Sequence, residues 1–321
     1  KTHVLTLLDN LRKLNIEVEL LCIMEGVFTE EARELGIPVT IIPQEKRWDL
    51  SVLSKVKKFI NNCGCDLVHC HGARANYISL FIRGGVKVPM ITTLHSDYKL
   101  DFKDNPRKQL IYTPINAFAL RRYKHILAVT KAFKYMLMLR GFKEERIDVI
   151  YNGIDFSQEL QTYDMYTFFK NINVPHDLNK KYVGIAARLF AVKGVNVFLD
   201  MAKIIADKRE DIDFIILGNG EMWQQCQDFI KGNKLENRVY MAGQVTDPVM
   251  MNSYYKYIDV NTLTSYSESF PYALLEGARC KCATVATAVG GIPEMIIDGE
   301  SGCLVQSGDS KALAECVEML C

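Results

Sequence analysis

The chain has 321 residues, of which 49% are hydrophobic and 24% charged, and its formal net charge is +1. This is the composition of an ordinary soluble globular protein, and the length predicts two domains. No apolar run is long enough to span a bilayer, and no signal peptide is visible. These features favour a cytoplasmic location.

The charges are distributed unevenly. Residues 1–152 carry 24 Lys and Arg against 16 Asp and Glu, whereas residues 153–321 carry 15 against 22. The segment 105–143 contains nine Lys or Arg, no acidic residue and interleaved Leu, Ile, Tyr and Phe. This pattern favours peripheral contact with an anionic membrane, at its inner face; the alternative is an ordinary solvated basic domain that the acidic half attracts. No nucleic-acid-binding module is recognisable, so nucleic acid is not an expected partner.

Apolar periodicity predicts alternating helices and strands in the first half. The predicted helices are 2–11, 29–35, 49–62, 73–82, 106–123 and 131–140. The predicted strands are 16–23, 38–42, 66–69, 89–94, 126–129 and 147–150. Strands that alternate with helices of this length indicate βαβ units and a parallel sheet.

Tyr151-Asn152-Gly153 and about thirty weakly patterned residues interrupt this alternation and predict a connection between domains. A second alternating set follows, with strands at 182–187, 214–217, 238–241, 257–263, 284–287 and 303–305, and helices near 194–207, 221–231, 247–255, 271–281 and 309–320. The expected fold is α/β, with two doubly wound parallel-sheet domains, 1–152 and 153–321. Ligands of such sheets bind outside the carboxyl ends of the strands, by default in the cleft between the domains.

Both ends of the sequence look truncated. A doubly wound domain normally begins with a strand, yet the first predicted helix has no strand before it. The last helix stops at Cys321 while still in its apolar pattern. We therefore expect the sequence to belong to a longer chain.

The ten cysteines are scattered along the chain. Cys63/Cys65 and Cys280/Cys282 are each separated by a single residue, and no second pair completes the spacing of a zinc site. We therefore expect reduced thiols in a reducing cytosol.

Polar residues also follow the predicted strands of the first half, at His69, His71, His95, Ser96 and Asp97. We do not expect the His69–His71 run to bind a metal, because alternate residues at a strand end point to opposite faces. His95 leaves its strand directly into the expected site, where a histidine can bind a sugar or phosphate or transfer a proton. The alternative is a structural histidine.

The richest stretch of the chain is 265–279, where a strand exit, a turn and a helix start follow one another. We expect Pro271 in the first helical turn and Ser267 or Ser269 as the N-cap. The free N–H groups and the dipole of such a helix attract a phosphate or carboxylate.

Two acids mark this stretch, Glu268 at the turn and Glu276 eight residues later. Two carboxylates at this spacing near a phosphate site suggest contacts with a sugar and a ribose. The alternative is that Glu268 is an ordinary first-turn acid favoured by the helix dipole and that Glu276 is a solvated helix residue.

Three further segments lie just after predicted strands. Arg188 and Lys193 provide two cations that suit a diphosphate, unless they are simply solvated. The glycines of Gly218-Asn219-Gly220 let a ligand approach the backbone, although such a pair is often just a turn. The full G-x-G-x-x-G pattern is absent, so NAD is disfavoured. The Gly290–Glu294 segment predicts a structural turn before a helix.

Taken together, these motifs closely resemble glycosyltransferase family 4. The resemblance covers nearly the whole chain and rests on the order of its segments: 66–71, 93–95, 149–155, 188–194, 217–220, Gly243, 267–276 and 290–294. It implies a GT-B fold, with an N-terminal acceptor-binding domain and a C-terminal donor-binding domain, both Rossmann-like. Two features depart from the family pattern: Pro271 stands where many members have Gly, and the first strand with its Gly-rich turn is missing.

The resemblance also implies roles for individual residues. Glu276 would hold the ribose hydroxyls, and Glu268 would face the donor sugar. His95 would contact that sugar near the reacting carbon, while Arg188 and Lys193 would stabilise the leaving diphosphate.

The remaining donor-binding residues implied are Ser269 and Phe270, through their backbone N–H groups, Gly218 and Gly220, and Tyr240 and Gly243 near the base.

The function implied is retaining transfer of a hexose from a UDP- or GDP-linked sugar to a glycan or lipid-linked acceptor, as in cell-surface polysaccharide synthesis. No metal and no cofactor are expected, because cations of the chain would replace a metal. The alternatives are a GT-B-fold epimerase or phosphorylase, or a non-catalytic protein that binds sugar nucleotides. We identify no pyridoxal-binding lysine site that a phosphorylase would need.

Overall fold

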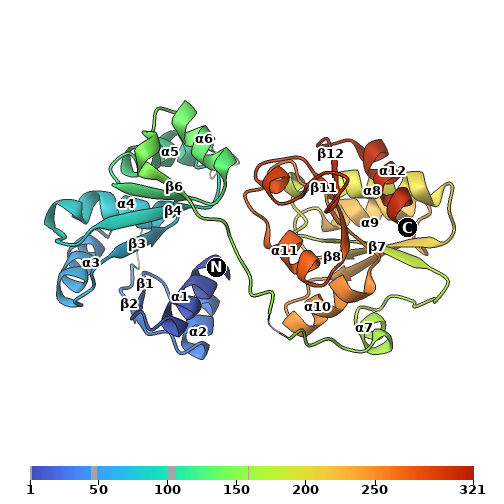
Figure 1. Ribbon diagram of the computed structural model, residues 1–321, viewed down its shortest axis with the longest axis horizontal. Helices are drawn as coiled ribbons and strands as arrows, with labels where there is room; N and C mark the ends of the chain where they lie inside the picture. The colour runs from blue at the N-terminus through green and yellow to red at the C-terminus, as the bar shows by residue number, and fades with distance from the viewer. Residues whose placement is uncertain (1, 45–48, 100–105, 158) are drawn as a thin grey trace. The chain divides into compact units, whose positions relative to one another are not determined.

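The computed structural model describes residues 2–44, 49–99, 106–157 and 159–321. The chain divides into two compact units, Lys1–Asn152 and Gly153–Cys321. In both units, helices alternate with strands, and every strand pairing within the described residues is parallel (Figure 1). The predicted α/β class is therefore confirmed.

The first unit contains a four-stranded sheet in the order β3-β4-β5-β6 and a separate two-stranded sheet of β1 and β2. Its strands are β1 Leu20–Cys22, β2 Val39–Ile41, β3 Val68–His71, β4 Met90–Leu94, β5 His125–Ala128 and β6 Ile147–Val149. Its helices are α1 Thr2–Lys13, α2 Val27–Glu34, α3 Ser51–Asn62, α4 Ala73–Ile82, α5 Pro106–Leu120 and α6 Lys131–Leu139. The prediction of a single sheet here is wrong, because β1 and β2 pair only with each other in the part of the chain that the structure describes.

A buried polar network ties α4 to the four-stranded sheet and to α5. Asn76 of α4 accepts hydrogen bonds from the hydroxyls of Thr92 (2.8 Å) and Tyr123 (3.1 Å), and its amide donates to Asn116 of α5 (3.1 Å). All four side chains are buried. A polar group buried without its partners costs free energy, so these bonds fix where α4 lies.

The second unit contains one six-stranded sheet in the order β12-β11-β10-β7-β8-β9. Its strands are β7 Lys181–Ala186, β8 Ile212–Leu217, β9 Val239–Gly243, β10 Val260–Leu263, β11 Ala283–Thr287 and β12 Cys303–Val305. Its helices are α7 Met165–Asn171, α8 Val195–Ala206, α9 Trp223–Gly232, α10 Pro248–Tyr257, α11 Tyr272–Arg279 and α12 Ser310–Leu320. The chain starts in the middle of the sheet, runs to one edge, and then returns to the other side of β7. This is the strand order of a doubly wound dinucleotide-binding fold.

Helices cover both faces of this sheet, and α8, α9 and α12 lie opposite α7 and α10 (Figure 1). Strand β8 is apolar at every position except Asp213, because helices cover both of its faces. Ile212, Phe214 and Ile216 pack against the first group of helices, while Ile215 and Leu217 pack against the second. A strand covered on both faces needs a continuous apolar run rather than an alternating one.

Helix α7 lies in the weakly patterned segment that was predicted to connect the two domains. Asp164 caps it by accepting a hydrogen bond from the backbone N–H of Thr167, and Phe168 and Phe169 anchor it in the core. At seven residues the helix is too short to show a helical period, so packing rather than pattern defines it.

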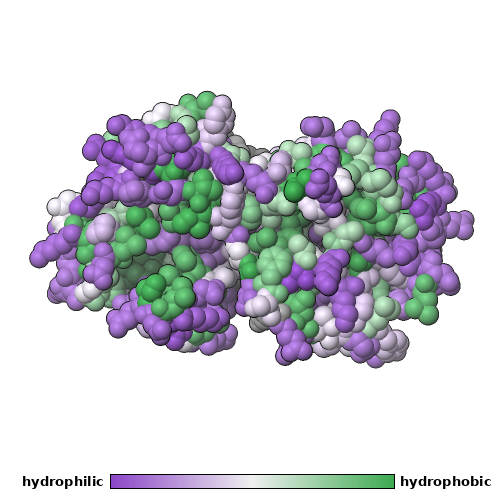
Figure 2. Space-filling view, viewed as in Figure 1, coloured by the Kyte–Doolittle hydropathy of each residue, from purple (hydrophilic) through white to green (hydrophobic). Residues whose placement is uncertain are grey.

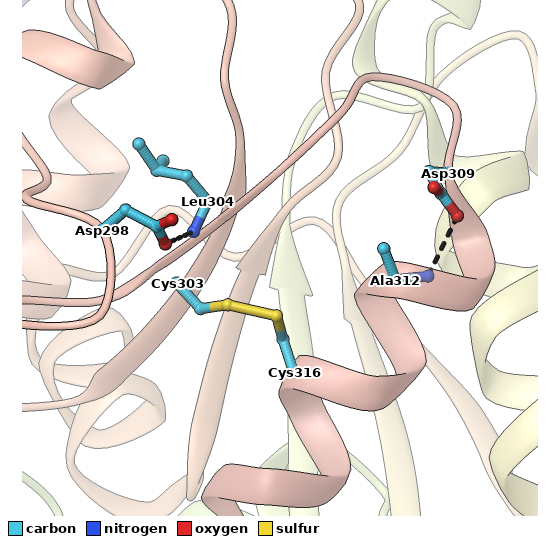
Figure 3. The surroundings of a disulfide bond; sticks show 6 residues. All are labelled: Asp298, Cys303, Leu304, Asp309, Ala312 and Cys316. Atoms are coloured by element: carbon cyan, nitrogen blue, oxygen red, sulfur yellow. Dashed lines mark hydrogen bonds between the residues drawn. A yellow bond between two sulfur atoms is a disulfide. The ribbon is translucent and has the colours of Figure 1, made fainter.

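The prediction that all cysteines are reduced is wrong for one pair. Cys303 in β12 and Cys316 in α12 form a disulfide across 13 positions of sequence (Figure 3). Nearby, Asp298 accepts a hydrogen bond from the backbone N–H of Leu304, and Asp309 caps α12 through the N–H of Ala312. The last strand and the last helix are thereby joined covalently as well as by packing.

The basic segment 105–143 spans α5, β5 and α6, although its first residue lies outside the described ones. No helix within the described residues is both long and apolar enough to cross a membrane.

We expect Asn76→Ala to lower the free energy of unfolding by about 2 kcal/mol. The substitution removes the hydrogen bonds that the buried side chains of Thr92, Tyr123 and Asn116 make with Asn76. Urea unfolding monitored by circular dichroism measures this. Asn10→Ala, which removes an exposed asparagine of α1, is the control and should change stability by less than about 0.5 kcal/mol. Equal effects of the two substitutions would show that the network contributes nothing.

Candidate functional site

The second unit has its topological switch point between β7 and β10. These strands are neighbours in the sheet, but the chain leaves them in opposite directions, toward β8 and β11. Ligands of such folds bind at a switch point of this kind, outside the carboxyl edge of the sheet. The loop after β7 carries Arg188 and Lys193, and the loop after β10 carries Glu268.

Lys193 and Glu268 form an ion pair at this edge. The Lys193 Nζ lies 2.5 Å from Oε1 of Glu268, and the hydroxyl of Ser265 donates to the same oxygen at 2.6 Å. The side chain of Glu268 is only 8% exposed and that of Lys193 is 20% exposed. Two groups predicted to bind different parts of a ligand therefore contact each other. Ser265, whose hydroxyl bonds to Glu268, is a further residue of this cluster, and no role was predicted for it.

The two loops are held together by direct backbone contact. Gly194 has a positive φ of 63°, and a Cβ there would collide with the carbonyl oxygen of Thr264. The Thr264 hydroxyl donates to the carbonyl of Gly194 at 2.9 Å. Gly290 plays the same role for the next loop, because a side chain there would collide with the carbonyl oxygen of Glu268. These contacts fix the backbone positions from which the side chains of Lys193 and Glu268 extend.

Helix α11 spans Tyr272–Arg279, so Pro271 lies just before the first helical turn rather than in it. Pro271 is its N-cap residue, with extended dihedral angles of −72° and 127°, and Tyr272 is the first helical residue. The predicted cap by Ser267 or Ser269 is wrong, because no side chain of the described residues makes the cap hydrogen bond. The backbone carbonyl of Ser269 instead accepts a bond from the N–H of Gly291 at 2.9 Å, and Phe270 is buried.

Glu276 lies on α11 and is half-buried. Burial raises the pKa of its carboxyl above the ordinary value of 4.5, although a hydrogen bond from Tyr255 and the nearby Arg279 act in the opposite direction. The Tyr255 hydroxyl approaches Oε2 of Glu276 at 3.4 Å, a long hydrogen bond. Glu276 is thus not the solvated helix residue of the alternative interpretation.

The glycines of Gly218-Asn219-Gly220 are required by packing. A Cβ at Gly218 would collide with the carbonyl oxygen of Ala187, and one at Gly220 with that of Leu189. The N–H of Leu189 donates to the carbonyl of Asn219 at 3.0 Å. The segment therefore supports the loop that carries Arg188, which gives these glycines a structural reason independent of any ligand.

The structure does not bring Arg188, Tyr240 and Gly243, the remaining predicted residues of the second unit, together at one place. Arg188 is exposed, with its guanidinium carbon 5.3 Å from the ring centroid of Phe190. Tyr240 lies near the start of β9, where its hydroxyl donates to the carbonyl of Asn237 at 2.8 Å, whereas Gly243 ends the strand. Of the last two, only Gly243 is at the carboxyl edge of the sheet.

A cluster of histidines lies at the carboxyl edge of the four-stranded sheet in the first unit. His71 ends β3, His95 follows β4, and His3 lies in the first turn of α1. Nδ1 of His71 is 3.1 Å from Nε2 of His95, and the ring centroids of His3 and His95 are 4.6 Å apart. His69 stacks beside His71 at 4.2 Å between centroids.

Three of these imidazoles, those of His69, His71 and His95, are neutral at pH 7. Burial is the largest cause that lowers the pKa of each of the four, to about 4 for His69 and His95 and still further for His71. The neighbouring rings lower these values further, because two adjacent imidazolium ions repel each other.

The prediction that His69 and His71 point to opposite faces of their strand is wrong. Residues two apart in a strand share a face, and the ring centroids of these two histidines are 4.2 Å apart. Sequence reasoning also missed His3, because nothing in the local pattern links residue 3 to positions 71 and 95. Only the folded structure brings them together.

Asp97, another of the polar strand-end residues, has a structural role. Arg140 binds both of its carboxylate oxygens at 2.6 Å. Burial alone would raise the pKa of Asp97, but the bonds from Arg140 and from the N–H of Lys99 outweigh it and the pKa is lowered.

Comparisons with known proteins agree with this arrangement. Residues 1–158 match the family model described as Glycosyltransferase Family 4, and residues 180–321 match that of Glycosyl transferases group 1. A glycosyltransferase of Methanocaldococcus jannaschii is 27% identical, covering 81% of this chain and 66% of the relative. The N-acetyl-alpha-D-glucosaminyl L-malate synthase of Bacillus anthracis is 26% identical, covering 84% and 68%. The chain thus spans about two thirds of the length of these relatives.

Among solved structures, HepE of Anabaena in complex with UDP-glucose superposes with a TM-score of 0.80 at 23% identity, covering 99% of this chain and 85% of that one. The fold is therefore of the GT-B class, as predicted. The two family models together account for nearly the whole sequence, and the chain belongs to glycosyltransferase family 4.

We expect Glu276→Gln to raise the free energy of unfolding at pH 7 in the absence of ligand. The folded-state pKa of Glu276 lies above its unfolded-state value, so its contribution to stability is full below about pH 4.5 and is lost as pH rises through the folded-state pKa. The amide carries no charge to bury, so the advantage of the variant should grow as pH rises from about 4.5 through the folded-state pKa and then level off. Urea unfolding from below pH 4.5 to pH 8 measures it, and an advantage independent of pH over this whole range would contradict the assignment.

Proposed function

We propose that the protein transfers a sugar from a nucleotide-diphosphate sugar to the hydroxyl of an acceptor, with retention at the anomeric carbon. The observation that carries this proposal is the Lys193–Glu268–Ser265 cluster at the switch point of the second unit. It places a fixed ammonium group beside a carboxylate at the edge of the sheet where nucleotides bind in such folds.

The chemistry needs positive charge on the leaving group. As the bond between the anomeric carbon and the diphosphate oxygen breaks, its electron pair stays on that oxygen. Lys193 and Arg188 stabilise the developing charge without a metal or cofactor. The acceptor oxygen then bonds to the anomeric carbon, and its proton passes to the leaving diphosphate. His95 contacts the transferred sugar, as the family resemblance implies.

Glu268 positions Lys193 rather than attacking the sugar. Its Oε1 already accepts bonds from Lys193 and Ser265, and a carboxylate oxygen engaged in this way is a poor nucleophile. Retention by a double displacement needs a free carboxylate close to the anomeric carbon. We therefore favour attack of the acceptor from the face that the diphosphate leaves.

Glu276 holds the ribose. Its charge is destabilised by burial, and Tyr255 meets it only through a long bond. Two ribose hydroxyls would supply the missing donors, so binding would relieve a cost already present in the free protein.

The relatives suggest the donor and the described surface suggests the acceptor. HepE binds UDP-glucose, and the Bacillus anthracis relative is named for N-acetylglucosaminyl transfer, so we propose a UDP-linked hexose or N-acetylhexosamine ahead of a GDP-linked one. The acceptor is a glycan or lipid-linked saccharide, of the kind used for cell-surface polysaccharide.

The basic segment supplies a surface for a lipid-linked acceptor at the cytoplasmic face of a membrane. Leu110, Ile111, Tyr135 and Leu139 are all more than half exposed in α5 and α6. Hydrophilic and hydrophobic atoms adjoin one another over these helices (Figure 2). Exposed apolar side chains beside Lys and Arg favour an anionic bilayer.

An assay with a panel of nucleotide sugars tests the proposed activity. The full-length protein is incubated with UDP-, GDP- and ADP-linked sugars, with and without candidate acceptors. Release of free nucleotide that depends on an acceptor supports transfer. Change of the donor sugar without nucleotide release would support an epimerase, and binding without any reaction would support a non-catalytic protein. Absence of binding to every nucleotide sugar would reject all three.

We expect Glu276→Ala to weaken UDP binding at least tenfold, because it removes the acceptor for the ribose hydroxyls. Isothermal titration calorimetry measures the affinity. Glu315→Ala, at an exposed site of α12, is the control and should bind UDP as the unchanged protein does. Unchanged affinity in the Glu276 variant would contradict the ribose assignment.

We expect Lys193→Met to lower kcat by about 10²-fold or more, because the leaving diphosphate loses a preorganised cation. Lys203→Met removes an exposed lysine of α8 and should leave kcat unchanged. If both variants turn over like the unchanged protein, Lys193 has no part in catalysis.

We expect vesicles containing anionic lipid to sediment the protein, and neutral vesicles to do so far less, because the proposed contact is largely electrostatic. Raising the salt concentration should release it. Binding that is insensitive to both lipid charge and salt would contradict the proposal.

A further inference from the structure

Three histidines of the first unit have the arrangement of a metal-ligand set. One ring nitrogen from each of His3, His71 and His95 lies within 4.8 Å of the corresponding nitrogens of the other two. The three come from α1, the end of β3 and the residue after β4, so the fold brings them together from separate elements.

The distance between the ring nitrogens of His71 and His95 suits a tetrahedrally coordinated metal ion. Zinc binds imidazole nitrogen at about 2.0–2.1 Å, which places two ligands of a tetrahedral site roughly 3.4 Å apart. Nδ1 of His71 and Nε2 of His95 are already 3.1 Å apart. Without a metal, one of these nitrogens must donate its proton to the other. Metal binding would require that proton to move to the other nitrogen of its ring, so that both facing nitrogens offer a lone pair, and the rings to turn until the two lone pairs converge on the ion.

His3 is oriented for the same task. Its Nδ1 lies 2.9 Å from the side-chain oxygen of Asn152, so Nδ1 carries the proton and donates it to that oxygen. This leaves the lone pair of Nε2 free to bind a metal. A ligating histidine typically donates its other N–H to an oxygen in this way, which fixes its tautomer and its orientation.

We propose that His3, His71 and His95 bind one divalent transition-metal ion of the zinc class. Three neutral imidazoles select Zn²⁺, Cu²⁺, Ni²⁺ or Co²⁺ over Mg²⁺ and Ca²⁺, which prefer oxygen ligands. Three ligands leave a fourth position open for water or a substrate oxygen. The ion inhibits sugar transfer, because it occupies the nitrogen that His95 would offer to the sugar; this second part rests on the proposed function.

Binding is measured on the metal-free full chain with Zn²⁺ by calorimetry and with Co²⁺ by visible spectroscopy. We expect one equivalent of each metal, and a Co²⁺ spectrum without the near-ultraviolet band of thiolate ligation, which excludes the free cysteines as ligands. His71→Gln and His3→Gln should weaken binding by 10-fold to 100-fold or more.

His125→Gln is the matched control. This histidine of β5 is exposed and pairs with Asp148, away from the cluster, so its loss should leave metal affinity unchanged. Circular dichroism establishes that each variant is folded. In addition, Zn²⁺ should raise the melting temperature of the unchanged protein and of His125→Gln, but not that of His71→Gln.

Several results would overturn the proposal. These are equal affinity in the unchanged protein and the folded His71 and His3 variants, a thiolate band with Co²⁺, or no metal binding at all. Inhibition is tested separately by adding Zn²⁺, and then a chelator, to the transfer assay, with Mg²⁺ as the control. Tight binding to the histidines without inhibition would overturn only the second part, and failure of the transfer assay itself would leave the binding result standing.

Discussion

The pairing of β7 with β10 is the constraint on which the donor half of the protein depends. It makes two loops neighbours although 75 residues separate Lys193 from Glu268. Glycines at the points of contact then let one backbone lie directly on the other, which no residue with a Cβ would permit. The reactive side chains extend from loops whose positions are already fixed, and this is the preorganisation that electrostatic catalysis requires.

The two units differ in the charge that they present at the carboxyl edges of their sheets. At the switch point of the second unit, the ammonium group of Lys193 lies beside the nearly buried carboxylate of Glu268. In the first unit, burial and the neighbouring rings lower the pKa of His69, His71 and His95 to about 4 or below, so these imidazoles are uncharged at pH 7. One edge thus offers a fixed cation, and the other offers uncharged nitrogen lone pairs, which can accept a proton or a metal but attract no anion.

The sequence predicted what depends on local order along the chain. Strand ends, the spacing of Glu268 and Glu276 and the motif order were readable because parallel strands bring their carboxyl ends to one edge. It failed where a distant segment decides the outcome. His3 joins His71 and His95 only after folding, the β1–β2 pair leaves the main sheet, and Cys303 meets Cys316 through packing of α12. Gly218 and Gly220 are required by packing, because a Cβ at either position would collide with the chain itself, and their contact with a ligand stays a prediction.

The strand order of the second unit also has a consequence for folding. Strands β7, β8 and β9 can pair in sequence as the chain grows, but the other side of β7 stays open until β10 arrives. Until then, an apolar strand presents unpaired N–H and C=O groups, and such an edge can pair with another chain. Closing the edge brings together segments far apart in sequence, which is slow because of the entropy of the intervening loop. The Lys193–Glu268 pair joins the loops that follow β7 and β10, so it requires this edge to be closed.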